Sequence, residues 1–185
     1  MRFSPTALAG AFVIDLDRHH DERGFFARTA CVDEFAAHGV EVSFPQANVS
    51  HNTRRGTLRG MHYAVAPAAE SKLVRCVVGA VYDVIVDLRV GSPTRHQWFG
   101  VELSRANGRA MYVPNGVAHG FLTLMDDTDV MYLMGDVHRP ETSRGVRWDD
   151  PLLAIEWPFE PTVISDRDRT YPDADGEDPP GRARR

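Results

Sequence analysis

Short apolar runs separated by glycine, proline and charged residues dominate this chain. The clearest run covers residues 72–89, where valines recur on both sides of Gly79 and Ala80. Strands rich in β-branched residues have this pattern, and the glycine marks a tight turn between two of them. Two further strand pairs are predicted at residues 99–104 with 109–114 and at residues 116–124 with 129–135. Short strands at this spacing predict an all-β fold, either a sandwich or a barrel.

The remaining segments add little regular structure. The first apolar run, within residues 1–17, is predicted as an opening strand, and residues 32–39 favour one short helix that stops at its glycine. Residues 172–185 are polar and rich in proline and glycine, which is typical of a flexible tail. A chain of 185 residues without internal repeats is therefore predicted to form one domain, residues 1–171, followed by that tail.

Three polar side chains fall on otherwise apolar strand faces. Alternation places Lys72, His119 and Tyr132 each on the same face as buried-type residues of its own strand. Singly, each has an ordinary explanation, such as a lysine reaching solvent or a hydrogen-bonded core histidine. An unpaired buried ammonium group is costly, so Lys72 must either lie at the wet mouth of the fold or meet an anionic group. Together the three residues are candidates for the lining of one cavity.

Composition and charge narrow the classes of function. The formal net charge is −5, which disfavours non-specific binding to nucleic acid. No apolar run approaches the roughly 20 residues that span a membrane. Cys31 and Cys76 are far apart and form no CxxC motif, so we expect two free thiols in a reducing cytoplasm.

A metal site is one alternative for the candidate chemistry. Cupin metal sites use a His-x-His pair, but His62 is flanked at those spacings by Gly60 and Ala64. A three-ligand site made of His62, Glu70 and His119 remains conceivable. It would make the protein a metal-dependent cupin enzyme, such as an isomerase or a dioxygenase.

Six ordered sequence blocks carry a resemblance to a known family. They are DERGFF (21–26), QANVSHN (46–52), GTLRGMHY (56–63), KLVRCVVGAVYDVIVDLRVGSPT (72–94), VPNGVAHGF (113–121) and RGVRWDDP (144–151). Together, from about residue 2 to about residue 173, the chain closely resembles the dTDP-4-dehydrorhamnose 3,5-epimerase family. The resemblance implies a cupin-like jelly-roll β-barrel with a few short helices, assembled as a homodimer. It also implies an enzyme that uses neither a metal nor an organic cofactor.

The resemblance further implies a reaction. The substrate is a nucleoside-diphosphate 4-keto-6-deoxyhexose, whose C4 ketone acidifies the protons on C3 and C5. A base removes one proton, an enolate forms with its charge on O4, and an acid returns a proton from the opposite face. His62 matches the family's base, Tyr132 its acid and Lys72 its cation at O4. Asp168 matches the carboxylate that orients the base, with Asp83 as the rival orienting group.

Binding residues are implied in the same way. Arg23 and Arg59 match groups for the diphosphate, where a guanidinium suits phosphate oxygens. Gln46 and Asn48 match polar residues near the nucleotide, and His119 lines the sugar pocket. Phe26 and Arg23 belong to an N-terminal segment that in this family reaches the partner subunit's site.

Two departures from the family pattern concern the nucleobase. Arg28 stands where the family has a glutamate, and His138 stands where it has an aromatic residue, usually tyrosine. A guanidinium donor does not replace a carboxylate acceptor. The carrier therefore stays open between dTDP, CDP and GDP, as does inversion at C3, C5 or both carbons. A binding module of the same fold without catalysis is a further alternative.

The stretch around Gly60 sets a geometric condition. Arg59 and His62 are an odd number of residues apart, so a regular strand would point them to opposite faces. If both face one substrate, the backbone must bulge between them, and Gly60 is the residue that permits this.

Overall fold

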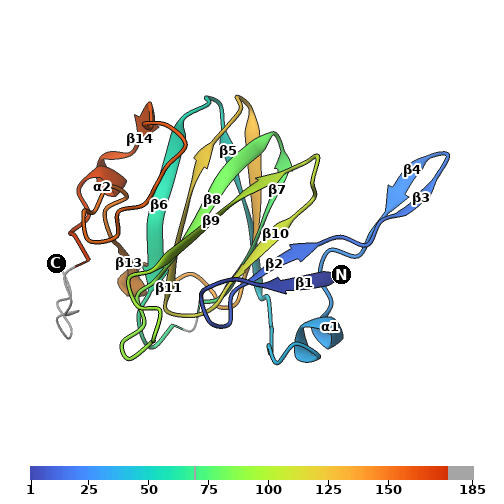
Figure 1. Ribbon diagram of the computed structural model, residues 1–185, viewed down its shortest axis with the longest axis horizontal. Helices are drawn as coiled ribbons and strands as arrows, with labels where there is room; N and C mark the ends of the chain where they lie inside the picture. Colours follow the sequence, from blue (N-terminus) through green and yellow to red (C-terminus); the bar gives the residue numbers. More distant parts are fainter. Residues whose placement is uncertain (69, 175–185) are drawn as a thin grey trace.

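Two facing antiparallel sheets form the body of the protein in the computed structural model, which describes residues 1–68 and 70–174 (Figure 1). The first sheet contains, in spatial order, β1 (Arg2–Pro5), β2 (Phe12–Asp15), β10 (Ala110–Val113), β7 (Lys72–Val78), β12 (Thr128–Met134) and β5 (Gln46–Asn52). The second contains β13 (Ser143–Gly145), β6 (Thr57–Ala64), β11 (Val117–Thr123), β8 (Ala80–Asp87) and β9 (Trp98–Ser104), with β14 (Val163–Ile164) parallel to β6. The all-β, jelly-roll prediction is confirmed, and the two sheets remain separate rather than closing into one hydrogen-bonded ring.

The predicted strands form, but the pairings predicted for them are wrong. β7 and β8 flank Gly79, yet they belong to different sheets, and the same holds for β9 with β10 and for β11 with β12. Gly79 has a φ of +74°, so the chain turns there from one sheet into the facing one. An alternating apolar pattern shows that a strand has a buried face, but it does not show which strand lies beside it.

The main core lies between the sheets, and two smaller clusters cover their outer faces. The central cluster includes the fully buried Val74, Ile85, Met111, Phe121 and Val130. On the outside of the second sheet, the chain after β13 packs Val146 and Leu153 against Met61, Val84 and Ala118. On the outside of the first sheet, α1 (Val32–Ala36) packs Phe35 against Ile14 and Leu73. Each sheet therefore keeps an inner face on which a site can be built.

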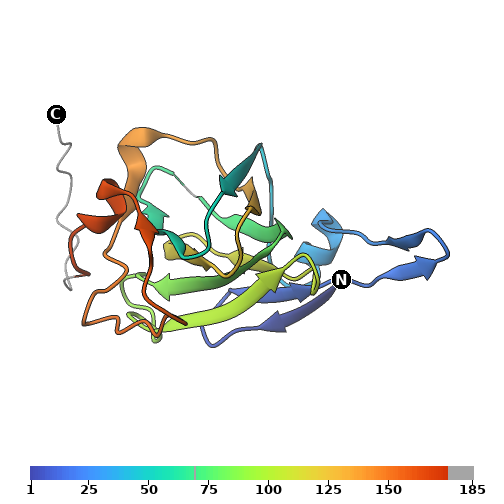
Figure 2. The same cartoon turned by 90° about the horizontal axis from the view of Figure 1, so that it is seen from above.

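The N-terminal region differs from the single opening strand that was expected. It forms β1 and β2, followed by a two-stranded hairpin of β3 (His19–Asp21) and β4 (Gly24–Phe26). The hairpin projects away from the sandwich in both views (Figures 1 and 2). Its second strand carries Phe25 and Phe26, which are 51% and 77% exposed. The Phe25 ring meets the His20 ring at 5.7 Å and the Arg18 guanidinium at 4.7 Å, and both phenylalanine rings stay largely exposed.

The C-terminal end of the described chain is packed. Residues 172–174 were expected to begin a flexible tail, but the carbonyl of Pro172 accepts a hydrogen bond from the Arg147 N–H at 3.0 Å. Ala174 is buried, and its N–H donates to the Asp150 carboxylate. The rest of the predicted tail, residues 175–185, lies outside the described residues.

The helices are short. Besides α1, they are η1 (Pro140–Thr142) and α2 (Asp166–Arg169). In the described ranges no helix has the length and apolar character needed to cross a bilayer. Cys31 and Cys76 are both free thiols.

Strand β6 bulges at Gly60, as the geometric condition required. Its pairing with β11 places His62 opposite His119 and Arg59 opposite Phe121, so residues 60 and 61 together face Gly120. Gly60 has a φ of +135°, and a Cβ added there would lie 2.5 Å from the Gly120 Cα. The bulge places Arg59 and His62 on the same inner face, because each now lies opposite an inward-pointing residue of β11.

Gly60→Ala is expected to destabilise the fold by more than backbone strain alone. A non-glycine residue at positive φ costs about 1–3 kcal/mol, and the Cβ additionally collides with the β11 backbone. The matched control is Gly24→Ala, since Gly24 has a φ of +127° but nothing within 4 Å of its added Cβ. Urea unfolding should show the larger loss of unfolding free energy for Gly60→Ala. Equal losses would show that the close approach of β6 to β11 adds nothing.

Candidate active site

A histidine–aspartate pair lies beside the bulge on the second sheet. His62 Nε2 is 2.7 Å from Asp168 Oδ1, and the two side chains are 35% and 7% exposed. β6 supplies the histidine, and α2 carries the aspartate across the strand edge. The pair thus combines an imidazole that solvent can reach with a carboxylate that it hardly can.

The sequence around Asp168 explains how this carboxylate is held. Ser165 caps α2, and its hydroxyl accepts the Asp168 N–H at 3.1 Å. Asp168 Oδ2 accepts the N–H of Gly60 at 3.3 Å. Burial raises the pKa of Asp168, but the hydrogen bond and charge of His62, with the Gly60 N–H, outweigh it, so the pKa lies below its ordinary value. An ionised Asp168 that accepts from Nε2 leaves Nδ1 as the ring nitrogen with a free lone pair.

A second histidine–aspartate pair lies next to the first. His119 is the cross-strand partner of His62, and its Nε2 is 2.7 Å from Asp83 Oδ1, with side chains 4% and 0% exposed. Burial raises the pKa of Asp83 even though His119 and Lys72 oppose the shift. Asp83 therefore contacts His119, and Asp168 contacts His62. Asp83 Oδ2 has no hydrogen-bond partner among the described residues.

Tyr132 faces the second pair from the opposite sheet. It lies on β12 between Asn48 of β5 and Val74 of β7, and its ring meets the His119 ring edge-on at 5.9 Å. Burial, with the negative charge of Asp83, raises the Tyr132 pKa far above its ordinary value. The phenol thus keeps its proton at neutral pH.

Lys72 begins β7 at the same end of the sandwich and is buried. Its ammonium forms an ion pair with Glu70 Oε1 at 3.1 Å and donates to the His62 carbonyl at 3.3 Å. Of the two alternatives set by burial, the structure therefore has the anionic partner, and that partner comes from the chain itself.

The structure does not support the three-ligand metal alternative. His62, Glu70 and His119 each have a different partner, namely Asp168, Lys72 and Asp83. Within residues 1–68 and 70–174, no group of three or more His, Cys, Asp or Glu side chains is placed to hold a metal ion.

Arg59 is held without a counter-charge. Its Nε donates to Asn52 Oδ1 at 2.8 Å, and Nη2 donates to the His51 carbonyl at 3.4 Å. Asn52 is buried and in turn donates to the carbonyls of Ser50 and Thr128. No carboxylate of the described chain forms an ion pair with Arg59. Its charge is therefore available to an anionic ligand.

Three of the predicted nucleotide residues meet at the edge strand β5. Gln46 Nε2 donates to Asn48 Oδ1 at 3.1 Å, and the His138 N–H donates to Gln46 Oε1 at 3.0 Å. Asn48 pairs in register with Tyr132, so its side chain lies on the inner face. This group borders the Tyr132 side of the site.

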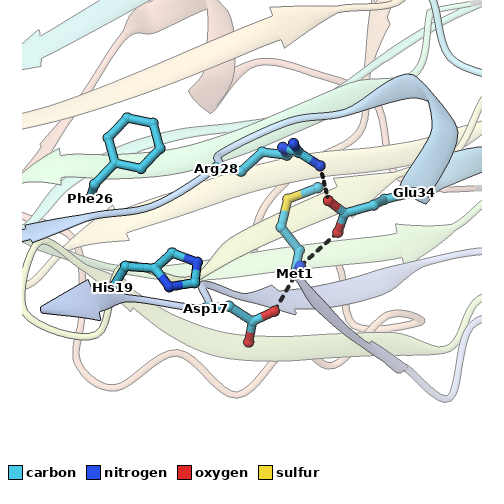
Figure 3. A pocket seen from close by; sticks show the side chains of 6 residues that line it. All are labelled: Met1, Asp17, His19, Phe26, Arg28 and Glu34. Carbon is cyan, nitrogen blue, oxygen red and sulfur yellow. Dashed lines mark hydrogen bonds and ion pairs between the residues drawn. The ribbon is translucent and has the colours of Figure 1, made fainter.

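Arg23, Phe26 and Arg28 lie elsewhere within one chain. Arg23 is on the projecting hairpin, paired with Asp21. Phe26 and Arg28 border a pocket of about 250 Å³ at the root of the hairpin (Figure 3). It is lined by Met1, Asp17, His19, Phe26, Arg28 and Glu34, and Arg28 is paired there with Glu34 at 2.8 Å. Among the described residues, nothing joins these three to the His62 pair.

Sequence reasoning missed two residues of the site. Asn52 anchors Arg59, and alternation along β5 could have placed it on the same face as Asn48. Tyr171 packs its ring edge-on against His62, with centroids 5.8 Å apart. It follows α2 in irregular chain, where no periodicity indicates which way a side chain points.

Comparison with known proteins decides the family. A family model described as dTDP-4-dehydrorhamnose 3,5-epimerase matches residues 5–175. This chain belongs to that family. The match contains the β3–β4 hairpin, α2 and every strand except most of β1, so every candidate site residue lies within it.

Individual members of the family are similar over nearly their whole length. A dTDP-4-dehydrorhamnose 3,5-epimerase of Methanothermobacter thermautotrophicus is 42% identical over 173 residues, covering 92% of each chain. A dTDP-4-dehydrorhamnose 3-epimerase of Streptomyces niveus is 41% identical, covering 91% of this chain and 82% of its own. The crystal structure of the Bacillus anthracis 3,5-epimerase, with TDP and PPi bound, superposes with a TM-score of 0.90 at 41% identity, covering 93% and 98%. Its similarity confirms the jelly-roll fold of this family member.

Proposed function

We propose that residues 1–171 act as one epimerase domain that inverts C3, C5 or both in a nucleoside-diphosphate 4-keto-6-deoxyhexose, without a cofactor. The observation that carries this proposal is the His62–Asp168 pair, an accessible imidazole oriented by a low-pKa carboxylate. On the facing sheet, Tyr132 keeps its proton and Lys72 is a buried ammonium. Together with the base, they supply the acid and the cation that proton transfer beside a ketone requires.

Each residue has one task in the proposed reaction. His62 takes the proton from the carbon beside the C4 ketone, and ionised Asp168 stabilises the imidazolium that results. The electron pair moves onto O4, where the Lys72 ammonium balances the growing negative charge. Tyr132 then donates its proton to the carbanion carbon from the opposite face. The stereocentre is inverted, and exchange with solvent then removes the extra proton from the His62 imidazolium and returns one to the Tyr132 phenolate.

The proposal has two finer points, namely which nucleotide carries the sugar and whether C3, C5 or both carbons are inverted. The Bacillus anthracis structure contains TDP, which favours a dTDP-linked substrate for this chain. Relatives named as 3-epimerase and as 3,5-epimerase are almost equally similar, so both outcomes use the same framework. Arg59 is proposed to hold the diphosphate, with Gln46, Asn48 and His138 beside the nucleoside and His119 beside the sugar. Comparing the epimerisation rates of dTDP-, CDP- and GDP-linked sugars tests which nucleobase a site with Arg28 and His138 prefers.

We propose a cytoplasmic homodimer in which the β3–β4 hairpin reaches the site of a second copy. Support comes from the exposed rings of Phe25 and Phe26 and from Arg23, which lies in the turn between β3 and β4. A second copy would cover the rings and bring Arg23, Phe26 and Arg28 to a nucleotide. The two free cysteines agree with a reducing compartment.

The dimer is tested by mass in solution. The chain of 20.6 kDa should sediment at about twice that mass, because covering the aromatic rings drives association. Phe25→Ser combined with Phe26→Ser should shift the equilibrium towards single chains. Wild-type protein that sediments as one chain at micromolar concentration would refute the swapped hairpin.

His62→Ala is expected to abolish deuterium incorporation at C3 and C5 during incubation of the sugar nucleotide in D₂O. Loss of a general base costs about 10²–10⁴-fold in rate. The matched control is His51→Ala, because His51 Nδ1 also pairs with a carboxylate, Asp129 Oδ1, at 2.7 Å but on the exposed edge strand. NMR of the product reads the exchange. Unchanged exchange in His62→Ala would remove it as the base, and no exchange by wild type with any of the three carriers would leave only a binding module.

Tyr132→Phe is expected to separate proton removal from proton return. The His62 base is intact in this variant, so exchange at the enolate stage should persist, while formation of the inverted sugar falls by about 10²-fold or more. Comparing the rate of deuterium entry with the rate of epimer formation measures the two steps in one sample. Full epimerisation by the variant would contradict the assigned acid.

A further inference from the structure

We propose that Tyr171 is a positioning residue for the base His62, a role that rests on the proposed function. Tyr171 follows α2, the helix that supplies Asp168. Its ring meets the His62 ring at a centroid distance of 5.8 Å and an interplanar angle of 70°. His62 is therefore fixed by a hydrogen bond to Asp168 and by an aromatic edge contact from the same short segment.

The strand beside His62 is shaped for this ring. Gly145 of β13 is the cross-strand partner of His62 on the side away from β11. A Cβ added to Gly145 would lie 2.5 Å from Cζ of Tyr171, so the ring occupies the space that a side chain would fill. Only a glycine at this position leaves room for the aromatic ring next to the imidazole.

The segment that carries Tyr171 is held on both sides. Before it, α2 is capped by Ser165, and after it Pro172 and Ala174 are hydrogen-bonded to the chain following β13. The Arg167 guanidinium lies 5.6 Å from the ring centroid and covers the ring as a cation–π contact. A ring fixed in this way restricts the tilt of His62 without offering it a proton acceptor.

The ring of Tyr171, rather than its hydroxyl, carries the role. The hydroxyl oxygen is buried and has hydrogen-bond geometry to no described residue, and burial raises the Tyr171 pKa against the opposing charge of the nearby Arg167. Removing a buried hydroxyl that has no partner is close to neutral, whereas removing the ring frees His62. This difference supplies a conservative variant that keeps the contact.

Three variants test the proposal by steady-state epimerisation. Tyr171→Ala should lower kcat by about 10-fold or more with KM changed less than about 2-fold, because a misplaced base affects the chemical step more than binding. Tyr171→Phe should stay within about 2-fold of wild type in both constants. Gly145→Ala should lower kcat by displacing the ring, yet it should change little in the Tyr171→Ala background, where the space is already empty.

A second readout does not depend on turnover. The ¹⁵N imidazole signals of His62 in the ligand-free protein should shift in Tyr171→Ala and in Gly145→Ala but stay at wild-type positions in Tyr171→Phe. Unmoved signals together with an unchanged kcat in Tyr171→Ala would overturn the positioning role, as would additive effects of the two alanine substitutions. Failure of wild type to epimerise any substrate would refute the proposed function, and the His62 signals would then decide the contact by themselves.

Discussion

The close approach of β6 to β11 at Gly60 and Gly120 is the constraint on which the site depends. Without the bulge, His62 and Arg59 would lie on opposite faces of the sheet. The same irregularity turns the Gly60 N–H towards Asp168, so the backbone that aims the histidine also helps ionise its carboxylate. The bulge thus sets both the direction of the His62 side chain and the ionised state of Asp168.

Two adjacent histidines then differ because their carboxylates differ. The Asp168 carboxylate accepts hydrogen bonds from His62 and the Gly60 N–H and lies in a capped helix, and its pKa is lowered. Asp83 is fully buried, and its pKa is raised. The His62 side chain is about one third exposed, whereas the His119 side chain is buried and its ring contacts Tyr132. Burial therefore separates one pair that solvent can reach from another that packs against Tyr132.

Much of this could be predicted from the sequence, and the failures have a common cause. Alternation predicted the strands and the inward direction of Lys72, His119 and Tyr132, since a side chain's face depends only on its own strand. The strand pairings were predicted wrongly and the ring of Tyr171 was not predicted at all, because both depend on which distant segments meet. The carboxylate of His62 was left open between Asp83 and Asp168 for the same reason. One is 21 residues along the chain and the other 106, and only the fold brings the farther one to 2.7 Å.

The balance of charge in the site indicates how it takes its substrate. His62, His119 and Lys72 each face a carboxylate of the chain. Arg59 is bound only by the neutral Asn52 and a main-chain carbonyl. A diphosphate would meet an uncommitted cation there, whereas in the proposed reaction the O4 oxyanion would compete with Glu70 for Lys72. In the proposed reaction, the Arg59 charge is therefore available when substrate binds, whereas Lys72 turns from Glu70 to the sugar only as negative charge develops on O4.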